Sequence, residues 1–149
     1  MEYEHVWKKV LRNDEEVKFE FSVGKKYRMF YLILLSIFAS PFLIGTPAFG
    51  IILLLVVFFY FGYYLKAANA FAFTNKRVLI HRGWLSTNAI SIEYDKITDV
   101  SISEPFIERL VTKSGNIAIN TAGSSTKEVI LKHVQTPYEV RKQLDSIRA

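Results

Sequence analysis

Phe42 to Ile52 read FLIGTPAFGII, and the breaks that Gly45, Pro47 and Gly50 make in this apolar run decide the fold. The segment lies inside a longer stretch, Met29 to Leu65, that contains no Asp, Glu, Lys, Arg or His. All 19 basic and all 14 acidic residues lie outside that stretch. A small water-soluble domain distributes its charges, because each of its helices and strands has a wet face. The stretch is therefore predicted to lie in a membrane.

A chain reversal at the Gly/Pro segment would divide this stretch into two helices. A single helix over all of it would be roughly 55 Å long, nearly twice the ~30 Å of a hydrocarbon core. Proline and glycine end helices and permit turns. We therefore expect a two-span transmembrane helical hairpin over residues 27–65, with arms at roughly 27–44 and 48–65. The alternative is a helical hairpin buried inside a soluble protein.

The charges beside the two spans predict their orientation. Basic residues precede the first span and follow the second, whereas the connecting loop is uncharged. Basic residues near span ends stay in the cytoplasm. The chain is thus expected in the cell membrane with both termini cytoplasmic. Aromatic residues at the two outer ends of the hairpin fit an interfacial belt: Tyr27, Phe30, Tyr31, Tyr60, Tyr63 and Tyr64.

The segment before the hairpin, residues 1–26, predicts a short helix and a strand. Apolar residues recur at helical spacing over residues 2–12, which indicates an amphipathic helix that is solvated on one face, lies in the membrane plane or contacts a partner. Val17, Phe19, Phe21 and Val23 then alternate with polar residues, the period of a half-buried strand. A lone strand is not stable, so it is expected to pair with the sheet of the C-terminal part. Residues 1–26 as a whole, helix and strand, are expected to pack with the C-terminal domain.

The segment after the hairpin, residues 66–149, predicts a mainly-β domain. Six or seven short alternating runs are separated by turn-like residues, with a short helical stretch after Pro105 and a Gly-Ser loop at 122–126. The chain ends in an amphipathic helix for which Thr136 is the expected N-cap, with Pro137 at N1 and Glu139 completing a capping box. These elements predict a small antiparallel barrel or sandwich capped by the C-terminal helix.

Residues 70–148 resemble the membrane-flanked bacterial pleckstrin-homology-like (bPH_2 type) domain family. The first motif appears as Phe71, Phe73-Thr74, Arg77-Val78 and Gly83, and the second as Ile92, Ile97 and Asp99-Val100. The third appears as Gly115, Ile117, Ile119 and Thr121-Ala122-Gly123. The chain departs from the family pattern at VTKSGNI, residues 111–117, where a compact GIG turn is more usual. The resemblance implies a barrel-like sheet with a C-terminal helix, often preceded by a pair of spans.

The sequence carries no pattern of catalytic, metal-binding or cofactor-binding residues. There is no cysteine, and His5, His81 and His133 lie on unrelated elements without metal-ligand spacing. No phosphate-binding loop is present. The net charge is only +5, without a basic stripe, which argues against nucleic acid as a partner. We therefore expect no enzyme, no cofactor and no metal.

The stretch NKRVLIHRGWL, residues 75–85, supplies the candidate contact residues Lys76, Arg77, Arg82 and Trp84. Basic residues near an anionic leaflet hold lipid headgroups at about 1 kcal/mol each. The alternative is positive-inside charge, with Arg77 paired to a sheet carboxylate and Trp84 packed on a neighbouring strand or subunit. The leading functional hypothesis is a membrane-anchored, non-enzymatic binding or scaffolding module, whose cytoplasmic surface meets a protein partner or copies of itself. The alternative hypothesis is sensing of anionic inner-leaflet lipid.

Overall fold

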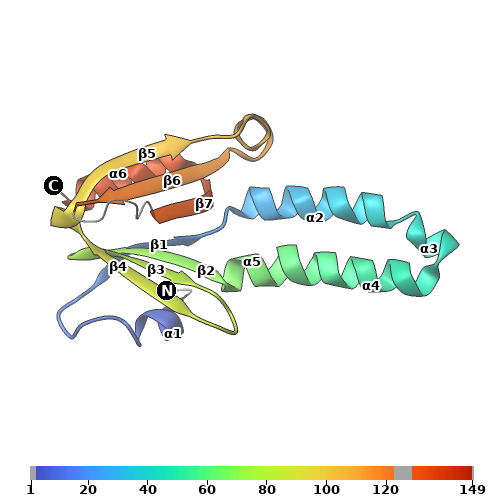
Figure 1. The fold of residues 1–149 in the computed structure, drawn as a ribbon, viewed down its shortest axis with the longest axis horizontal. Coiled ribbons are helices and arrows are strands. Elements are labelled where there is room, and N and C mark those ends of the chain that lie inside the picture. Colours follow the sequence, from blue (N-terminus) through green and yellow to red (C-terminus); the bar gives the residue numbers. More distant parts are fainter. Residues whose placement is uncertain (1–2, 123–128, 149) are drawn as a thin grey trace.

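Two antiparallel β-sheets face each other and carry a helical hairpin at one end (Figure 1). The computed structural model describes residues 3–122 and 129–148, so the predicted loop from Gly123 onward lies outside the described residues. The first sheet has the order β1 (Val17–Ser22), β2 (Asn69–Thr74), β3 (Arg77–Arg82) and β4 (Asn88–Glu93). The second has the order β5 (Ile97–Ser103), β6 (Ser114–Thr121) and β7 (Val129–Gln135). The 3₁₀ turn η2 (Tyr94–Lys96) connects the two sheets.

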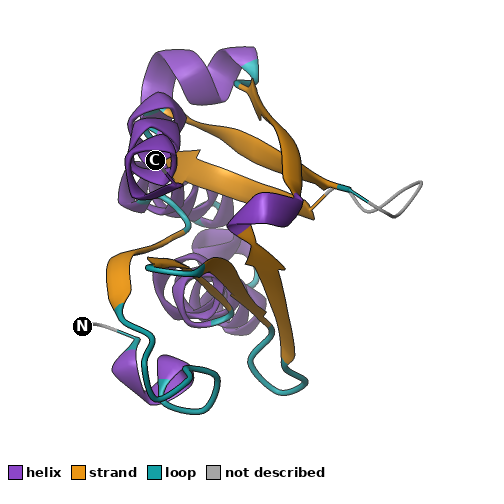
Figure 2. Cartoon of the chain, turned by 90° about the vertical axis from the view of Figure 1, so that its left-hand side faces the viewer, coloured by secondary structure: helices purple, strands orange, loops and turns teal. Residues whose placement is uncertain are grey.

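The core lies between the sheets and is built by strand alternation. Phe71 and Phe73 of β2 face the core, as do Ile117 and Ile119 of β6. Helix α6 (Pro137–Arg148) closes one side of the sandwich with Val140 and Leu144, both of which are buried in the same cluster. Figure 2 shows the two sheets as separate layers, with the arms of the hairpin behind them. The predicted mainly-β domain with a C-terminal helix is confirmed.

Strand β1 precedes the hairpin in sequence but belongs to the first sheet. It pairs antiparallel with β2, with Phe19 opposite Phe73 and Phe21 opposite Phe71. Beyond the strand, Val23 forms an isolated bridge with Val134 of the second sheet. The pairing expected for this N-terminal strand is therefore observed, and the β-domain contains residues from both sides of the hairpin.

The outer face of the first sheet is covered by the N-terminal helix. Helix α1 (Glu4–Trp7) is shorter than the predicted 2–12 and buries Trp7, which is only 1% exposed. Ala70 and Ala72 of β2 point to this face and leave room for the indole ring, since their side chains are small. The apolar stripe of this segment therefore packs on the sheet, rather than facing solvent, the membrane plane or a partner.

Two expectations about the later elements have different outcomes. The helical stretch after Pro105 is observed and includes the π-helical turn η3 (Glu108–Thr112). Helix α6 begins at Pro137 as expected, but Thr136 has a left-handed φ of 47° rather than the extended backbone usual at an N-cap. Thr136 and Glu139 are in contact through their backbones, since the Glu139 N–H donates to the Thr136 carbonyl at 3.0 Å.

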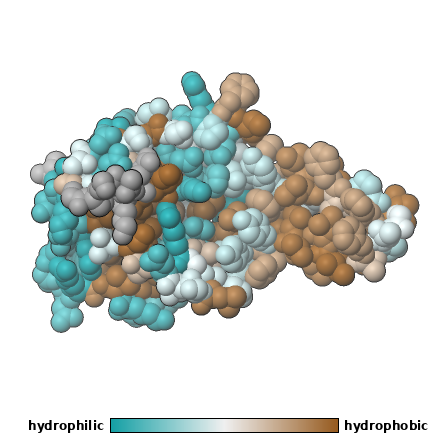
Figure 3. Space-filling model, viewed as in Figure 1, coloured by the Kyte–Doolittle hydropathy of each residue, from teal (hydrophilic) through white to brown (hydrophobic). Residues whose placement is uncertain are grey.

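The apolar stretch forms a helical hairpin that projects from the domain (Figures 1 and 3). The first arm is α2 (Lys25–Ala39), followed by the short helix α3 (Phe42–Gly45). The second arm is α4 (Pro47–Phe58), which continues through the π-helix η1 (Phe59–Tyr64) into α5 (Leu65–Ala67). The visible face of the arms is apolar in Figure 3, whereas the visible face of the domain is largely hydrophilic.

Gly50 is required where the second arm passes the turn. A Cβ at this position would lie 2.7 Å from the Leu43 nitrogen and 2.8 Å from the Phe42 carbonyl carbon. Because both are backbone atoms of α3, no larger residue fits without moving the turn. At the base of the hairpin, Arg28 of α2 donates to the Gly62 carbonyl of the second arm at 3.0 Å. The arms are thus fixed to each other at both ends.

Candidate functional site

The four candidate contact residues do not form one patch. Lys76 and Arg77 lie at the turn between β2 and β3, and Arg82 and Trp84 lie at the opposite end of β3. Strand β2 starts beside α5 and runs away from the hairpin, as Figure 1 shows. Six residues of strand cover about 20 Å, so the turn is far from the hairpin although it is near in sequence. The turn that carries Lys76 and Arg77 therefore does not lie beside the hairpin.

Arg77 is enclosed in a buried ion pair. Its guanidinium donates from Nε and Nη2 to the two carboxylate oxygens of Glu15, each at 2.9 Å, and from Nη2 to the Val10 carbonyl at 3.0 Å. Burial would raise the pKa of Glu15, but hydrogen bonds from Arg77, Thr74 and the Arg12 backbone outweigh it and lower the pKa to about 2. Arg77 therefore pairs with a carboxylate, as the alternative predicts, but Glu15 precedes β1, so the pair joins the N-terminal segment to the sheet.

Lys76 also has a carboxylate partner, on the surface. Its ammonium pairs with Asp14, and this hydrogen bond together with the charge of Lys76 lowers the pKa of Asp14. Both side chains are largely exposed, so the pair adds little stability. The pair does reduce the positive charge that the turn presents to other molecules.

Arg82 and Trp84 lie at the hairpin end of the first sheet. Arg82 donates to the Ile130 carbonyl of β7, which links the two sheets. The Trp84 ring is 45% exposed and contacts the second arm edge-on, with ring centroids 5.8 Å from Phe59 and 6.1 Å from Tyr63. Of the four candidates, Trp84 is the one that lines a cavity.

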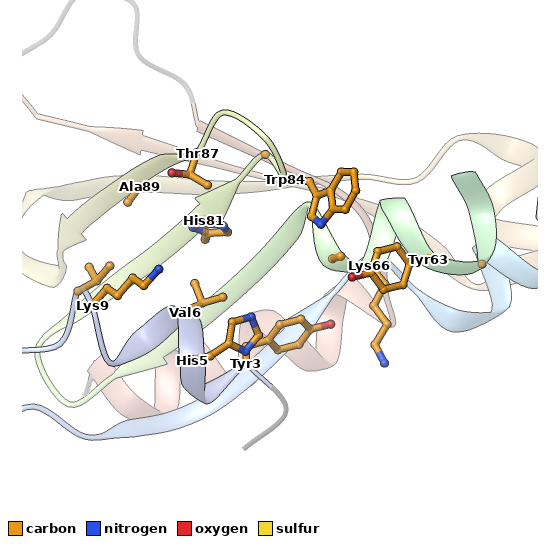
Figure 4. A pocket seen from close by; sticks show the side chains of 14 residues that line it. Tyr3, His5, Val6, Lys9, Tyr63, Lys66, His81, Trp84, Thr87 and Ala89 are labelled. Carbon is orange, nitrogen blue, oxygen red and sulfur yellow. The ribbon is translucent and has the colours of Figure 1, made fainter. Parts of the chain in front are cut away.

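This cavity is the candidate functional site. It encloses about 650 Å³ between the N-terminal segment, the base of the second arm and the hairpin end of strands β3 and β4 (Figure 4). Its size is that of a small-molecule site. The lining residues are Tyr3, His5, Val6, Lys9, Val10, Gly62, Tyr63, Lys66, Ala67, His81, Gly83, Trp84, Thr87 and Ala89.

Several basic side chains contribute to the cavity lining. Lys9 and Lys66 line it together with two imidazoles, His5 and His81, and no Asp or Glu among the described residues does so. Burial lowers the pKa of His81, a hydrogen bond with the Gly83 backbone raises it, and the nearby His5 and Lys9 lower it further. The cationic neighbours thus disfavour a further positive charge at His81, which an anion in the cavity would reverse.

The chemistry of the cavity suits binding. The lining combines cationic and imidazole nitrogens with the aromatic faces of Tyr63 and Trp84, a set that holds an anionic group with an apolar attachment. Within residues 3–122 and 129–148, the structure contains no group of three His, Asp or Glu side chains placed to hold a metal ion. Among the described residues that line the cavity, no contact pairs a nucleophilic side chain with a base.

Sequence reasoning missed His5, Lys9 and His81 as site residues. Two signals were available: His5 and Lys9 are four residues apart on one helical face, and His81 shares the outer face of β3 with Leu79. The sequence does not show which face of the first sheet α1 covers, because that depends on the packing of Trp7 against the two alanines of β2.

Comparison with known proteins places the chain in a family. The family described as bacterial PH domain matches residues 30–148. A search of curated proteins found no match. A DUF1696 family protein with a pleckstrin-homology domain from Shewanella loihica PV-4 is similar in structure, with a TM-score of 0.55 and 11% identity over 99% of this chain and 95% of that chain.

A pleckstrin homology domain from Shewanella amazonensis SB2B gives a TM-score of 0.56, with 11% identity over 99% of this chain and 86% of that chain. At this identity the two structures support the fold alone. The family match covers well over half of the chain and agrees with the two antiparallel sheets and the C-terminal helix. The chain belongs to the bacterial PH domain family.

Proposed function

We propose that this chain is a membrane-anchored, non-enzymatic binding module whose PH-like domain lies at the cytoplasmic surface. The observation that carries the proposal is the exposed apolar hairpin. Its candidate spans, Lys25–Gly45 and Pro47–Ala67, have 21 residues each and mean hydropathies of 1.7 and 2.3. At ~1.5 Å per residue each is about 31 Å long, which matches the hydrocarbon core.

The burial of the two arms favours lipid over a protein interior. Only 6% and 11% of the residues in their most apolar windows are buried by the rest of the chain. A core helix of a soluble protein is mostly buried, whereas these arms expose side chains such as Ile37, Phe38 and Leu55 at 63%, 68% and 64%. A bilayer removes this apolar surface from water.

Single-cysteine labelling tests the anchor and its orientation, because the chain contains no cysteine. Thr46→Cys places a thiol at the tip of the hairpin and Ser91→Cys places one on the exposed face of β4. In intact cells, a membrane-impermeant maleimide should label Thr46→Cys and should label Ser91→Cys only after permeabilisation. Labelling of Ser91→Cys in intact cells would reverse the orientation. Release of the chain by alkaline carbonate would contradict the anchor.

For the ligand of the module, we propose the anionic headgroup of an inner-leaflet phospholipid bound in the cavity. The cavity lies beside Tyr63, Lys66 and Ala67 at the end of the second span, where a headgroup would be within reach. Lys9 and His81 supply positive or chargeable groups for a phosphate, and Trp84 supplies an aromatic face at the interface. Of the four residues first considered for lipid sensing, this site keeps Trp84 and adds Lys9 and His81.

Native mass spectrometry of the detergent-solubilised full chain tests this ligand. Phosphatidylglycerol should be retained in preference to phosphatidylcholine. Lys9→Gln should reduce that retention several-fold, since each basic residue contributes ~1 kcal/mol at an anionic surface. The matched control is Lys76→Gln, which removes one lysine at the far end of the domain and should leave retention unchanged. Equal loss in both variants would indicate general charge attraction rather than a site.

A protein partner or a second copy of the chain is the second candidate, and the open edge of β4 favours it. Strand β4 pairs with β3 alone, and Asn88, Ala89 and Ser91 are exposed along it. An open edge accepts a further strand. A photo-crosslinking residue at position 91 should yield a discrete adduct in native membranes, whereas the same residue at Asp145 on α6 should not. Adducts of equal yield at both positions would contradict edge pairing.

A further inference from the structure

The connection between β5 and β6 has its polar and apolar sides reversed. In η3, Glu108 and Thr112 are buried, at 7% and 1% exposure. Phe106 just before it and Leu110 within it are 78% and 70% exposed. A helix on a water-soluble surface buries its apolar side chains and exposes its carboxylates, so this arrangement is unfavourable in water.

The reversal is fixed by contacts that hold η3 against the first arm. The Glu108 carboxylate lies 3.0 Å from Nδ1 of His133, and the His133 ring stacks on Tyr27 of α2 with centroids 4.0 Å apart. The Thr112 hydroxyl donates to the Glu108 carbonyl at 2.9 Å. The polar side of the turn therefore faces the domain, and its apolar side lies outside the domain core.

The exposed apolar side lies at the level where the hairpin leaves the domain. Figure 1 shows the β5–β6 connection at the hairpin end, above the start of α2, and Figure 3 shows apolar atoms protruding there. Ile107 and Val111 extend the apolar surface, at 54% and 47% exposure. The exposed Arg109 and Lys113 flank it, as cations do at a headgroup layer.

A second apolar tip lies on the first sheet, at the same end of the domain. The β3–β4 turn carries Leu85, which is 91% exposed, next to Trp84. Gly83 holds this turn in a fixed shape, with a φ of 98° and a position at which a Cβ would meet the Ser86 carbonyl oxygen at 1.9 Å. The two tips therefore belong to different sheets, and both lie where the hairpin is attached.

We propose that these two tips, Phe106–Val111 and Trp84–Leu85, insert into the interfacial layer of the bilayer that holds the hairpin. The inference rests on the proposed membrane anchor and adds to it a docked domain. The hairpin supplies two points of attachment and the tips supply one more on each sheet, so the domain is held against the lipid surface rather than tethered above it. This contact removes the exposed apolar side of η3 from water.

Quenching by lipids tests the docked arrangement in the full chain. Single cysteines at Leu110, Leu55 and Thr98 are labelled with a polarity-sensitive fluorophore, and each protein is placed alone in nanodiscs with or without acyl-brominated phosphatidylcholine. Leu55 reports the hairpin, and Thr98 is an exposed residue at the far end of β5. The label at Leu110→Cys should lose fluorescence several-fold more than the label at Thr98→Cys. A fourth labelled variant, Leu85→Cys, reports the second tip and should be quenched like Leu110→Cys.

The outcomes separate this proposal from the anchor. Quenching at Leu55→Cys with Leu110→Cys no more quenched than Thr98→Cys would overturn the docked domain and leave the anchor in place. Absence of quenching at Leu55→Cys would overturn the anchor and the docking together. A blue-shifted but unquenched label at Leu110→Cys would show that the chain itself covers the tip, which also overturns the proposal.

Discussion

Basic residues have different surroundings at the two ends of the β-domain. At the far end, the cations of the β2–β3 turn are each paired with a carboxylate, Lys76 with Asp14 and Arg77 with Glu15. At the hairpin end, Lys9 and two imidazoles, His5 and His81, line a cavity. The far end therefore uses its basic residues to hold the N-terminal segment, whereas the hairpin end places basic side chains on the wall of a cavity.

Closeness in sequence to the hairpin therefore does not show closeness in space, because an intervening strand carries the chain to the other end of the sheet. Lys76 follows the second span by about ten residues, but β2 carries it to the opposite end of the sheet. His5 and Lys9 are separated from the second arm by β1 and the first arm, but the N-terminal segment brings them to its base. The following predictions test this contrast, from the largest effect to the smallest.

Replacement of Arg77 by Met should produce the largest loss. It leaves the buried Glu15 carboxylate without its cation, which costs about 3–5 kcal/mol in the free energy of unfolding. Arg82→Met is the control at the hairpin end, where one hydrogen bond to a carbonyl is lost at about 1 kcal/mol. Denaturant unfolding of the full chain in nanodiscs measures both. The double variant Arg77→Met/Glu15→Met should recover most of the loss, and a double variant as unstable as the single one would contradict a buried pair.

The Arg77–Glu15 pair should also make the far end sensitive to acid. The pKa of Glu15 is about 2 in the folded chain, below its ordinary value. A lowered folded pKa gives stability that is fully present above the ordinary pKa and is lost as the pH falls toward the folded value. The melting temperatures of the wild type and of Glu15→Gln should therefore converge between about pH 5 and pH 2. A gap that stays constant over this range would exclude Glu15 as the source.

Binding at the hairpin end should respond to pH through His81. Burial and the nearby cations lower its pKa, so it is charged only at acidic pH in the absence of ligand. A bound phosphate favours the charged imidazole, so phosphatidylglycerol retention should rise a few-fold as the pH falls from about 7.5 to 5.5. His81→Gln should remove this rise. A rise that persists in His81→Gln would assign the pH dependence to another group.

Lys76→Gln should have the smallest effect. Its ion pair with Asp14 is exposed on both sides, so its loss should leave the free energy of unfolding nearly unchanged. The same nanodisc unfolding experiment measures this change. A loss as large as that of Arg77→Met would mean that the turn is held by its surface charges rather than by the buried pair.

Much of the fold is legible in the sequence because periodicity reports burial directly. The alternation of Phe19 and Phe21 predicts β1, and the Gly/Pro segment around Gly50 predicts the reversal of the helices. The covering of the outer sheet face is not legible, because Trp7 belongs to a short helix and its acceptors are the inconspicuous Ala70 and Ala72. Of the candidate residues, Trp84 lines the cavity, whereas Lys76 and Arg77 lie at the other end of β3, because local patterns do not show which residues of a strand lie near the hairpin.

The pairing of β1 with β2 also sets the order in which the molecule is completed. During synthesis, β1 leaves the ribosome before either arm, and its neighbour emerges only after both arms have been made. The first sheet consequently cannot acquire this edge strand while the second arm is missing. The sandwich can therefore be completed only after both arms have been translated. In a truncated or stalled chain, β1, with its two phenylalanines, would be left unpaired and exposed.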